Sequence, residues 1–180
     1  MVDIESVTVG GVPVLSGFLN GVLAYVTGFV ASVALYAVVG TSVFTRWTFS
    51  GLSPGAEFGF VFYGAHLVPI TNGSATLNYA TQAANSGELF VLLVVVLLVG
   101  TGYSLAAADA VPADTRTKVL AGASLAAGYL PLVVFGGFYF TGTTDGVALS
   151  LSFPHVVVLS GVLFPVCLGA VGGYVASQST

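Results

Sequence analysis

The feature that most constrains this chain is the length of its stretches without a charged side chain. The chain of 180 residues contains three basic residues (Lys and Arg together) and seven acidic residues (Asp and Glu together). They leave five long uncharged stretches, at residues 6–45, 58–87, 89–108, 119–144 and 146–180. A helix needs about 20 predominantly apolar residues to cross a bilayer. Each stretch is therefore long enough to hold a membrane span.

Composition points the same way. The chain is 56% hydrophobic and 6% charged, with a mean hydropathy of +1.02, whereas soluble domains contain about 25% charged residues. A soluble domain of this size could not bury so much apolar surface, so part of it must face lipid. Three basic residues are too few for a polybasic lipid-binding segment or a nucleic-acid site. We expect a lipid bilayer around the chain and no nucleic-acid partner.

These patterns predict one all-α transmembrane domain over residues 1–180, a polytopic helical bundle. Five helices are favoured, at about 14–44, 54–70, 89–108, 119–140 and 154–176. The links between the last three are short, so consecutive helices there should be antiparallel neighbours.

The second segment is shorter than the others. Ser53 suits an N-cap, Pro54 suits the first helical position, and Glu57 places a negative charge in the first turn. From Pro54 to Val68 the helix would measure about 22 Å, less than the roughly 30 Å of a hydrocarbon core. The alternative to five spans is therefore four spans and one short re-entrant or interfacial helix.

The three basic residues bear on orientation. With five spans, Arg46, Arg116 and Lys118 all fall on one side, which the positive-inside rule makes cytoplasmic. We therefore expect a multi-pass cell-membrane protein with its N-terminus outside and its C-terminus in the cytoplasm. Four spans would separate Arg46 from the other two.

Three side chains of the second segment are candidate functional residues. In FYGAHLVPI, residues 62–70, His66 follows Tyr63 by three positions, so the two share a helix face. Glu57 lies nine positions before His66 and nearly on the opposite side. Ionisable groups inside membrane segments are functional candidates by default. Alternatively, His66 only marks the membrane boundary and Glu57 only starts the helix.

Two prolines are further candidates. Pro131 and Pro165 lie inside predicted spans and cannot donate to the carbonyls of Ala127 and Gly161, so each should kink its helix. Broken helices in transporters free carbonyls that bind ions. The alternative is that proline is simply frequent in membrane helices.

Metal binding and catalysis have weaker sequence support. His66 and His155 would share the outer surface in the five-span topology, so a zinc or copper site is an alternative. No ligand-spacing motif accompanies them, and we predict no metal site. The chain has no paired intramembrane aspartates and no intramembrane histidine pair for haem. We therefore expect no catalytic residue, no cofactor and no enzymatic activity.

The segment EFGFVFYGAHLV, residues 57–68, carries a resemblance. Together with the acidic excess and the Val, Ala and Gly richness, it is similar to a Phe-Tyr-x-Ala-His signature in a family of uncharacterised haloarchaeal multi-spanning membrane proteins. The position after the tyrosine is often Asn in that family and is Gly64 here. The resemblance implies a cell-membrane location and a bundle of four or five helices, and it implies no activity.

We expect a small transporter or channel-like subunit that works as an oligomer, with a pathway along the kinked helices and His66. The alternative is a non-transporting structural or accessory subunit of a larger membrane complex, assembled through small-residue helix faces. Gly17, Gly21 and Gly28 form one such face, where another helix could approach closely. A polar cavity reaching Tyr63 and His66 would favour transport, and a solid core around them would favour the accessory role.

Overall fold

The computed structural model describes residues 8–43, 52–72, 76–78, 87–108 and 110–179. It is 72% helical, which confirms the all-α class. The chain forms two compact units. Unit 1 comprises Met1–Val26, Val95–Leu132 and Gly161–Thr180, and unit 2 comprises Thr27–Val94 and Val133–Ser160.

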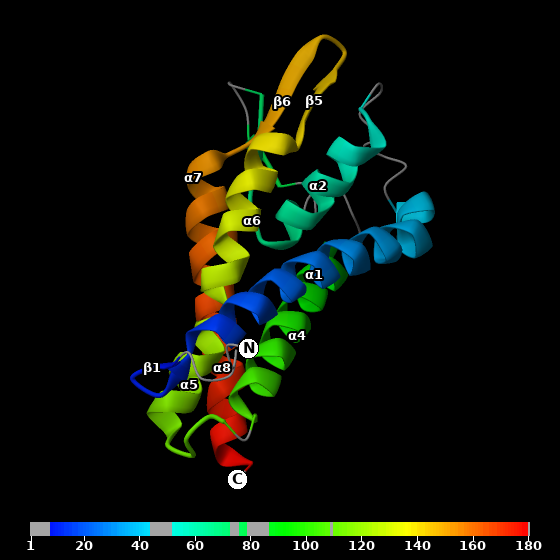
Figure 1. Ribbon diagram of the computed structural model, residues 1–180. Coiled ribbons are helices and arrows are strands. Elements are labelled where there is room, and N and C mark those ends of the chain that lie inside the picture. Colours follow the sequence, from blue (N-terminus) through cyan, green and yellow to red (C-terminus); the bar gives the residue numbers. More distant parts are fainter. Residues whose placement is uncertain (1–7, 44–51, 73–75, 79–86, 109, 180) are drawn as a thin grey trace, which may run out of the picture. The chain divides into compact units, whose positions relative to one another are not determined.

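All five predicted segments are helical. The helices are α1 (Val14–Val43), α2 (Pro54–Ala65), α4 (Gly87–Ala106), α5 (Thr115–Ala123), α6 (Ala126–Tyr139), α7 (Phe153–His155), the π-helix η3 (Val156–Leu163) and α8 (Phe164–Gln178) (Figure 1). Within the described residues, four helical stretches are long and apolar enough to cross a membrane: Val14–Val39, Gly87–Ala106, Thr115–Tyr139 and Phe153–Gln178. The 12-residue α2 is not among them, which agrees with the four-plus-one form of the prediction.

Unit 1 is held by helices whose backbones touch at glycines. Helices α5 and α8 run side by side (Figure 1). A Cβ atom on Gly122 of α5 would lie 2.1 Å from the carbonyl oxygen of Gly169 on α8. A Cβ atom on Gly21 of α1 would lie 2.1 Å from the carbonyl oxygen of Leu125. Only residues without a Cβ atom allow such an approach. The predicted close approach of another helix at Gly21 is therefore confirmed, and the partner lies within the same chain.

Polar side chains fix the start of α5 in unit 1. Asp114 is the N-cap of α5, and its side chain accepts a hydrogen bond from the Thr117 N–H at 2.9 Å. Hydrogen bonds from the side chain and then the backbone N–H of Thr117 hold the pKa of Asp114 below its usual value. Lys118 is buried, and its Nζ donates to the carbonyl oxygen of Ala176 near the end of α8 at 3.4 Å. A cation suits the C-terminal end of a helix, where carbonyls lack partners.

A two-stranded hairpin precedes α1 in unit 1. It pairs β1 (Thr8–Val9) with β2 (Val12–Pro13) in an antiparallel arrangement. Gly10 and Gly11 form its turn with φ values of 59° and 82°. Two consecutive positive φ values are characteristic of the tight hairpin turn that glycine favours.

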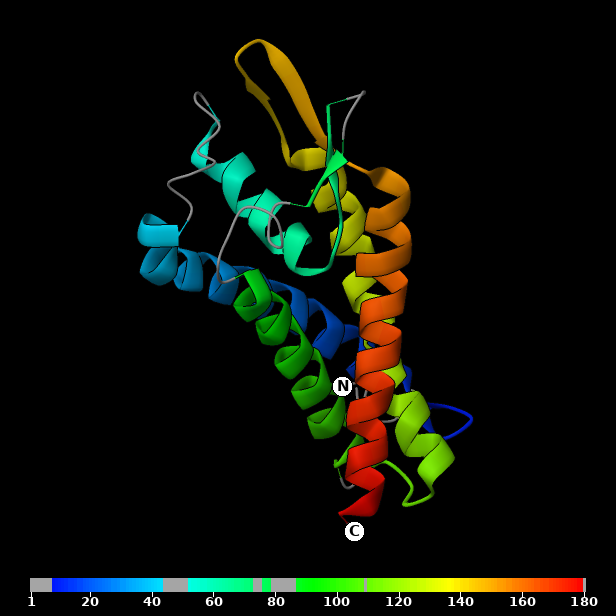
Figure 2. The same ribbon diagram turned by 180° about the vertical axis from the view of Figure 1, so that it is seen from behind.

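Unit 2 contains a four-stranded antiparallel sheet that the sequence analysis did not predict. Its strand order is β4–β3–β6–β5, with β3 (Ile70–Thr71), β4 (Thr76–Leu77), β5 (Thr141–Thr144) and β6 (Val147–Leu151) (Figure 2). The β5–β6 turn uses Asp145 and Gly146, with φ values of 49° and 80°. An Asp-Gly pair is a strong hairpin signal, so this dipeptide could have predicted the hairpin.

The sheet fixes the two ends of α2 against the rest of unit 2. Ile70, just after α2, pairs with Leu151 of β6. Gly142 of β5 faces the start of α2, where an added Cβ atom would lie 2.6 Å from Leu52 Cδ1. The sheet therefore holds the short helix at both ends.

Candidate functional site

Local chemistry determines where α2 begins. Ser53 is the N-cap, and its Oγ accepts a hydrogen bond from the Ala56 N–H at 3.3 Å. Pro54 stands in the first turn, as does Glu57. This is the predicted start, and the capping bond satisfies one of the helix's unpaired N–H groups.

The end of α2 comes earlier than the predicted residue 70. The Leu67 N–H donates to the Gly64 carbonyl at 2.9 Å, and the Val68 N–H donates to the Tyr63 carbonyl at 3.0 Å. These two bonds form a Schellman motif, which places its C′ residue in the left-handed region. Leu67 occupies that position with a φ of 62°. The helix therefore ends at Ala65, ahead of Pro69.

His66, the C-cap of α2, is fully buried. Its Nδ1 lies 2.8 Å from the carbonyl oxygen of Phe62. A carbonyl can only accept, so Nδ1 carries the proton in this bond. The ring also packs edge-on against Phe62, with centroids 4.7 Å apart. Burial lowers the pKa of His66 to about 4, outweighing the bond to Phe62, which raises it. The imidazole is therefore neutral at pH 7.

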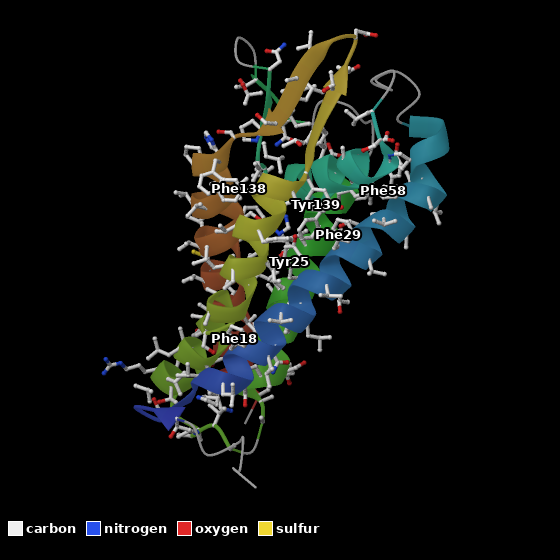
Figure 3. All side chains as sticks on the ribbon, turned by 45° about the horizontal axis from the view of Figure 1, so that its top comes forward. Phe18, Tyr25, Phe29, Phe58, Phe138 and Tyr139 are labelled. Carbon is white, nitrogen blue, oxygen red and sulfur yellow. The ribbon has the colours of Figure 1, made fainter. Side chains whose placement is uncertain are left out.

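Tyr63 is also fully buried, and its hydroxyl donates to the carbonyl oxygen of Val133 on α6 at 2.6 Å. Its ring contacts Phe62 at a centroid distance of 5.5 Å and Phe140 at 6.1 Å. Phe29 of α1, labelled in Figure 3, lies 5.6 Å from Phe62 and 5.5 Å from Phe140. We call this group the aromatic cluster of unit 2, consisting of Phe29, Phe62, Tyr63, His66 and Phe140.

Glu57 contacts a different element. Its Oε1 accepts a short hydrogen bond from the Tyr36 hydroxyl of α1. The Tyr36 ring packs edge-on against Phe58, labelled in Figure 3, at a centroid distance of 5.9 Å. Glu57 is half-buried. Glu57 thus bonds to α1, whereas His66 bonds to its own helix.

Two serines of unit 2 were not predicted as site residues. Ser32 on α1 and Ser160 in η3 are both fully buried, and neither hydroxyl has a hydrogen-bond partner among the described residues. By contrast, Thr101 on α4 donates to the carbonyl of Leu97 at 2.8 Å. Buried hydroxyls without partners are rare and costly. The sequence signal for Ser32 is a lone hydroxyl in the apolar run FVASVAL.

The two candidate prolines differ in their settings. Pro131 is exposed on α6, and the helix is interrupted earlier, at Ser124 and Leu125 between α5 and α6. Pro165 is buried at the start of α8, directly after the eight-residue π-helix η3. π-helical segments are rare and recur at functional sites.

The two histidines have different partners. His155 is exposed, and its Nδ1 lies 2.7 Å from Ser152 Oγ, whereas buried His66 bonds to Phe62. In the part of the chain that the structure describes, no group of three or more His, Cys, Asp or Glu residues could hold a metal ion.

Comparison with curated proteins gives no match, and comparison with solved structures gives none either. A family model with the description "Family of unknown function (DUF7978)" matches residues 5–180. Since this match covers almost the whole chain, the protein belongs to that family of unknown function.

Proposed function

We propose that this protein is a non-transporting structural or accessory subunit of a larger membrane complex. The observation that carries the proposal is the packing of Tyr63 and His66. Both side chains are fully buried in the aromatic cluster, and each bonds to a main-chain carbonyl within unit 2. Polar groups that line a pathway must exchange their partners with a passing solute. These two are instead arranged to hold α2 against α6 and to close its end, and we assign no catalytic role to them.

A small transporter or channel-like subunit working as an oligomer is the second candidate. The buried hydroxyls of Ser32 and Ser160, which have no hydrogen-bond partner in the described part of the chain, favour it. A hydroxyl without a protein partner can bind water or an ion more readily than a hydroxyl that is already hydrogen-bonded. Ser160 lies in the π-helix η3, and irregular helices line the binding sites of many transporters.

For topology, we propose four crossings, made by α1, α4, α5 with α6, and α7 with η3 and α8. A 12-residue α2 measures about 18 Å, too short for the hydrocarbon core. Four crossings return the chain to its starting side, so both termini lie together. Arg116 and Lys118 then share that side, and Arg46, which lies outside the described residues, falls on the other. The positive-inside rule favours the cytoplasm for both termini, in place of an N-terminus outside.

Exposed aromatic residues at the end of α6 support a membrane boundary there. Phe138 and Tyr139 are labelled in Figure 3. Phe138 is 68% exposed and Tyr139 is 69% exposed. Phe138 packs against Phe153 at the start of α7, with centroids 4.5 Å apart. Aromatic side chains concentrate where membrane helices meet the headgroups. The resemblance of residues 57–68 supports a haloarchaeal cell membrane as the location.

Two measurements test the function. Cross-linking in the native membrane, followed by purification in mild detergent, should give a particle that contains a second membrane protein at fixed stoichiometry. The purified chain in proteoliposomes should pass Na⁺, K⁺ and H⁺ no faster than protein-free vesicles. Flux above that baseline that is lost in Ser160→Ala would instead establish the transport candidate.

Cysteine labelling tests the topology. In a Cys167→Ala background, single cysteines at Thr143 in β5 and at Ser177 in α8 should react with an impermeant maleimide from opposite sides of the membrane. Reporter proteins that fluoresce only in the cytoplasm should report from both termini. If only one terminus reports, the chain crosses an odd number of times and our topology is wrong.

A further inference from the structure

We propose that Ser152 is a site of covalent acyl modification, with His155 as the base that activates its hydroxyl. The acyl donor is a carboxylic ester with an apolar chain. The two side chains meet in unit 2, where β6 leads into α7 (Figure 1). The inference goes beyond the proposed function, which requires no covalent chemistry. It concerns a single acyl transfer to the chain itself and involves no turnover.

The Ser152 hydroxyl differs from the side chains that begin α2 and α5. Ser53 and Asp114 are the N-caps of those helices, and each accepts a hydrogen bond from a backbone N–H three residues later. Ser152 holds the same position before α7, but its Oγ accepts no such bond among the residues that the structure describes. It lies instead 2.7 Å from Nδ1 of His155. A capping bond would stabilise the helix, so helix stability does not account for this arrangement.

The main chain holds the serine in place on both sides. The Ser152 N–H donates to the Pro69 carbonyl at 2.9 Å, and the Ser152 carbonyl accepts from the Val156 N–H at 2.9 Å. Leu151, the residue before it, pairs with Ile70 of β3. Proton transfer requires a nucleophile that stays within hydrogen-bond reach of its base. These main-chain bonds meet that requirement.

The two ring nitrogens of His155 have separate roles in the proposal. With the imidazole proton on Nε2, the lone pair of Nδ1 accepts the hydrogen bond from the Ser152 hydroxyl. His155 is exposed, so its Nε2–H donates to water. A hydroxyl that donates to a neutral imidazole is the arrangement of a nucleophile beside its general base.

A backbone donor stands next to the reacting oxygen. In enzymes with a strand–serine–helix order, the N–H of the residue after the serine stabilises the negative oxygen of the intermediate. Here β6 is followed by Ser152 and then by Phe153, the first residue of α7. The Phe153 N–H has no hydrogen-bond partner among the described residues. It is therefore available for the same task.

The reaction is an acyl transfer. The Ser152 oxygen attacks the carbonyl carbon of the ester while His155 Nδ1 takes the hydroxyl proton. The bond between the carbonyl carbon and the alkoxy oxygen then breaks, and His155 returns the proton to the leaving alkoxide. The products are the O-acyl ester of Ser152 and a free alcohol, and nothing is oxidised or reduced.

Two aromatic rings beside the serine favour a donor with an apolar chain. Phe153 packs against Phe138, which is labelled in Figure 3, with centroids 4.5 Å apart. Phe138 is 68% exposed and Phe153 is 37% exposed. Aromatic rings supply large apolar contact areas, so an acyl chain can lie against this pair while its carbonyl group reaches Ser152.

Incubation of the full chain in detergent with p-nitrophenyl decanoate tests the proposal. We expect a burst of about one equivalent of nitrophenol per chain, and mass spectrometry should locate a decanoyl group on Ser152. p-Nitrophenyl acetate should react roughly tenfold more slowly, and Phe138→Ala should reduce this difference. A wild-type chain that stays unacylated, or that is acylated at another residue, would overturn the proposal.

Three further variants assign the reaction to the pair. Ser152→Ala should abolish acylation. His155→Gln should slow it at least about 100-fold and leave the thermal unfolding midpoint unchanged. Ser150→Ala removes another exposed hydroxyl, on β6, and should react like the wild type. The proposal is wrong if Ser152→Ala still gains the acyl group, or if His155→Gln reacts at the wild-type rate.

Discussion

Glycine has different neighbours in the two units. In unit 1 an added Cβ atom on Gly122, Gly128 or Gly172 would lie 1.8–2.2 Å from a backbone carbonyl oxygen. In unit 2 the atoms nearest to an added Cβ on Gly59 or Gly137 belong to the side chains of Phe140 and Val156. At these positions unit 1 joins helix to helix by backbone contact, whereas unit 2 fills the space between its helices with side chains.

This difference explains where the polar chemistry lies. Helices whose backbones touch leave no room for a side chain at the contact itself, and the buried Lys118 of unit 1 extends instead to the end of α8. Helices held apart by aromatic rings leave room for polar groups between them. Unit 2 encloses His66, Ser32 and Ser160. We expect the glycine contacts of unit 1 to tolerate no added volume, and unit 2 to respond to pH and to graded changes of volume.

The largest effect should come from Gly122→Ala in unit 1. The new Cβ atom would lie 2.1 Å from the Gly169 carbonyl oxygen, so α5 or α8 must move as a whole. We expect a loss above about 4 kcal/mol, enough to prevent folding. Denaturant titration in mixed micelles measures it. Gly100→Ala on α4, where nothing lies within 4 Å, is the control, and equal stability of the two variants would contradict backbone contact in unit 1.

Acid should destabilise unit 2 by a smaller amount through His66. Burial lowers the folded-state pKa of His66 from 6.5 to about 4, so the unfolded chain binds more protons between these values. The contribution of His66 therefore leaves the unfolding free energy unchanged above pH 6.5. As the pH drops below 6.5, the same residue lowers the unfolding free energy, by about 3 kcal/mol at pH 4. The measurement is the unfolding free energy of the wild type and of His66→Gln at pH 7 and pH 4.

The difference between these two proteins isolates His66 from the acidic residues that also titrate in this range. His155→Gln, which changes the exposed histidine, should retain the acid sensitivity of the wild type. An acid response of the same size in His66→Gln would show that another group causes it.

The same substitution as in unit 1 should cost less in unit 2. Gly59→Ala places a Cβ atom 2.2 Å from Cγ of the Phe140 side chain. Phe140 stands between the end of α6 and the start of β5, so its side chain and a short piece of backbone can shift where two packed helices cannot. We therefore expect a loss of roughly 1–3 kcal/mol. The titration used for Gly122→Ala measures it. If Gly59→Ala also prevents folding, the two units do not differ in the way proposed here.

The sequence predicted what depends on neighbouring residues. Ser53, Pro54 and Glu57 identified the start of α2 because capping is settled within one turn. The predicted membrane spans likewise depended only on consecutive residues, because each is an uninterrupted uncharged stretch. The Asp145–Gly146 hairpin was equally local, and its signal was present but not used.

Other features depend on residues far apart in the chain. Gly21 indicated that a helix would approach closely, but no pattern identified Leu125 as its neighbour. Tyr63 and Val133 are separated by 70 positions, so their bond exists only once α2 and α6 are placed. The same holds for the pair of Tyr36 and Glu57. Sequence therefore indicated the candidate residues of α2 but not their partners.

The smallest effect should be a gain in stability at the end of α2. Leu67 holds a left-handed conformation with a φ of 62°, which costs a non-glycine residue about 1 kcal/mol or more. Its side chain is 42% exposed, so little packing is lost on its removal. Leu67→Gly should raise the unfolding free energy by roughly 0.5–1 kcal/mol, the strain relieved minus the added freedom of the unfolded chain. Leu67→Ala keeps the strain and should not gain.

This pair of variants also sharpens the comparison between the units. The strained turn follows directly after His66, whose ring bonds back to Phe62, so the ring and the turn close the same helix end. If the side-chain packing of unit 2 sustains the strain, Leu67→Gly should gain less when His66 is already replaced by Gln. Equal gains in both backgrounds would mean that the Schellman bonds alone hold the turn, and that the buried histidine is not needed to end the helix.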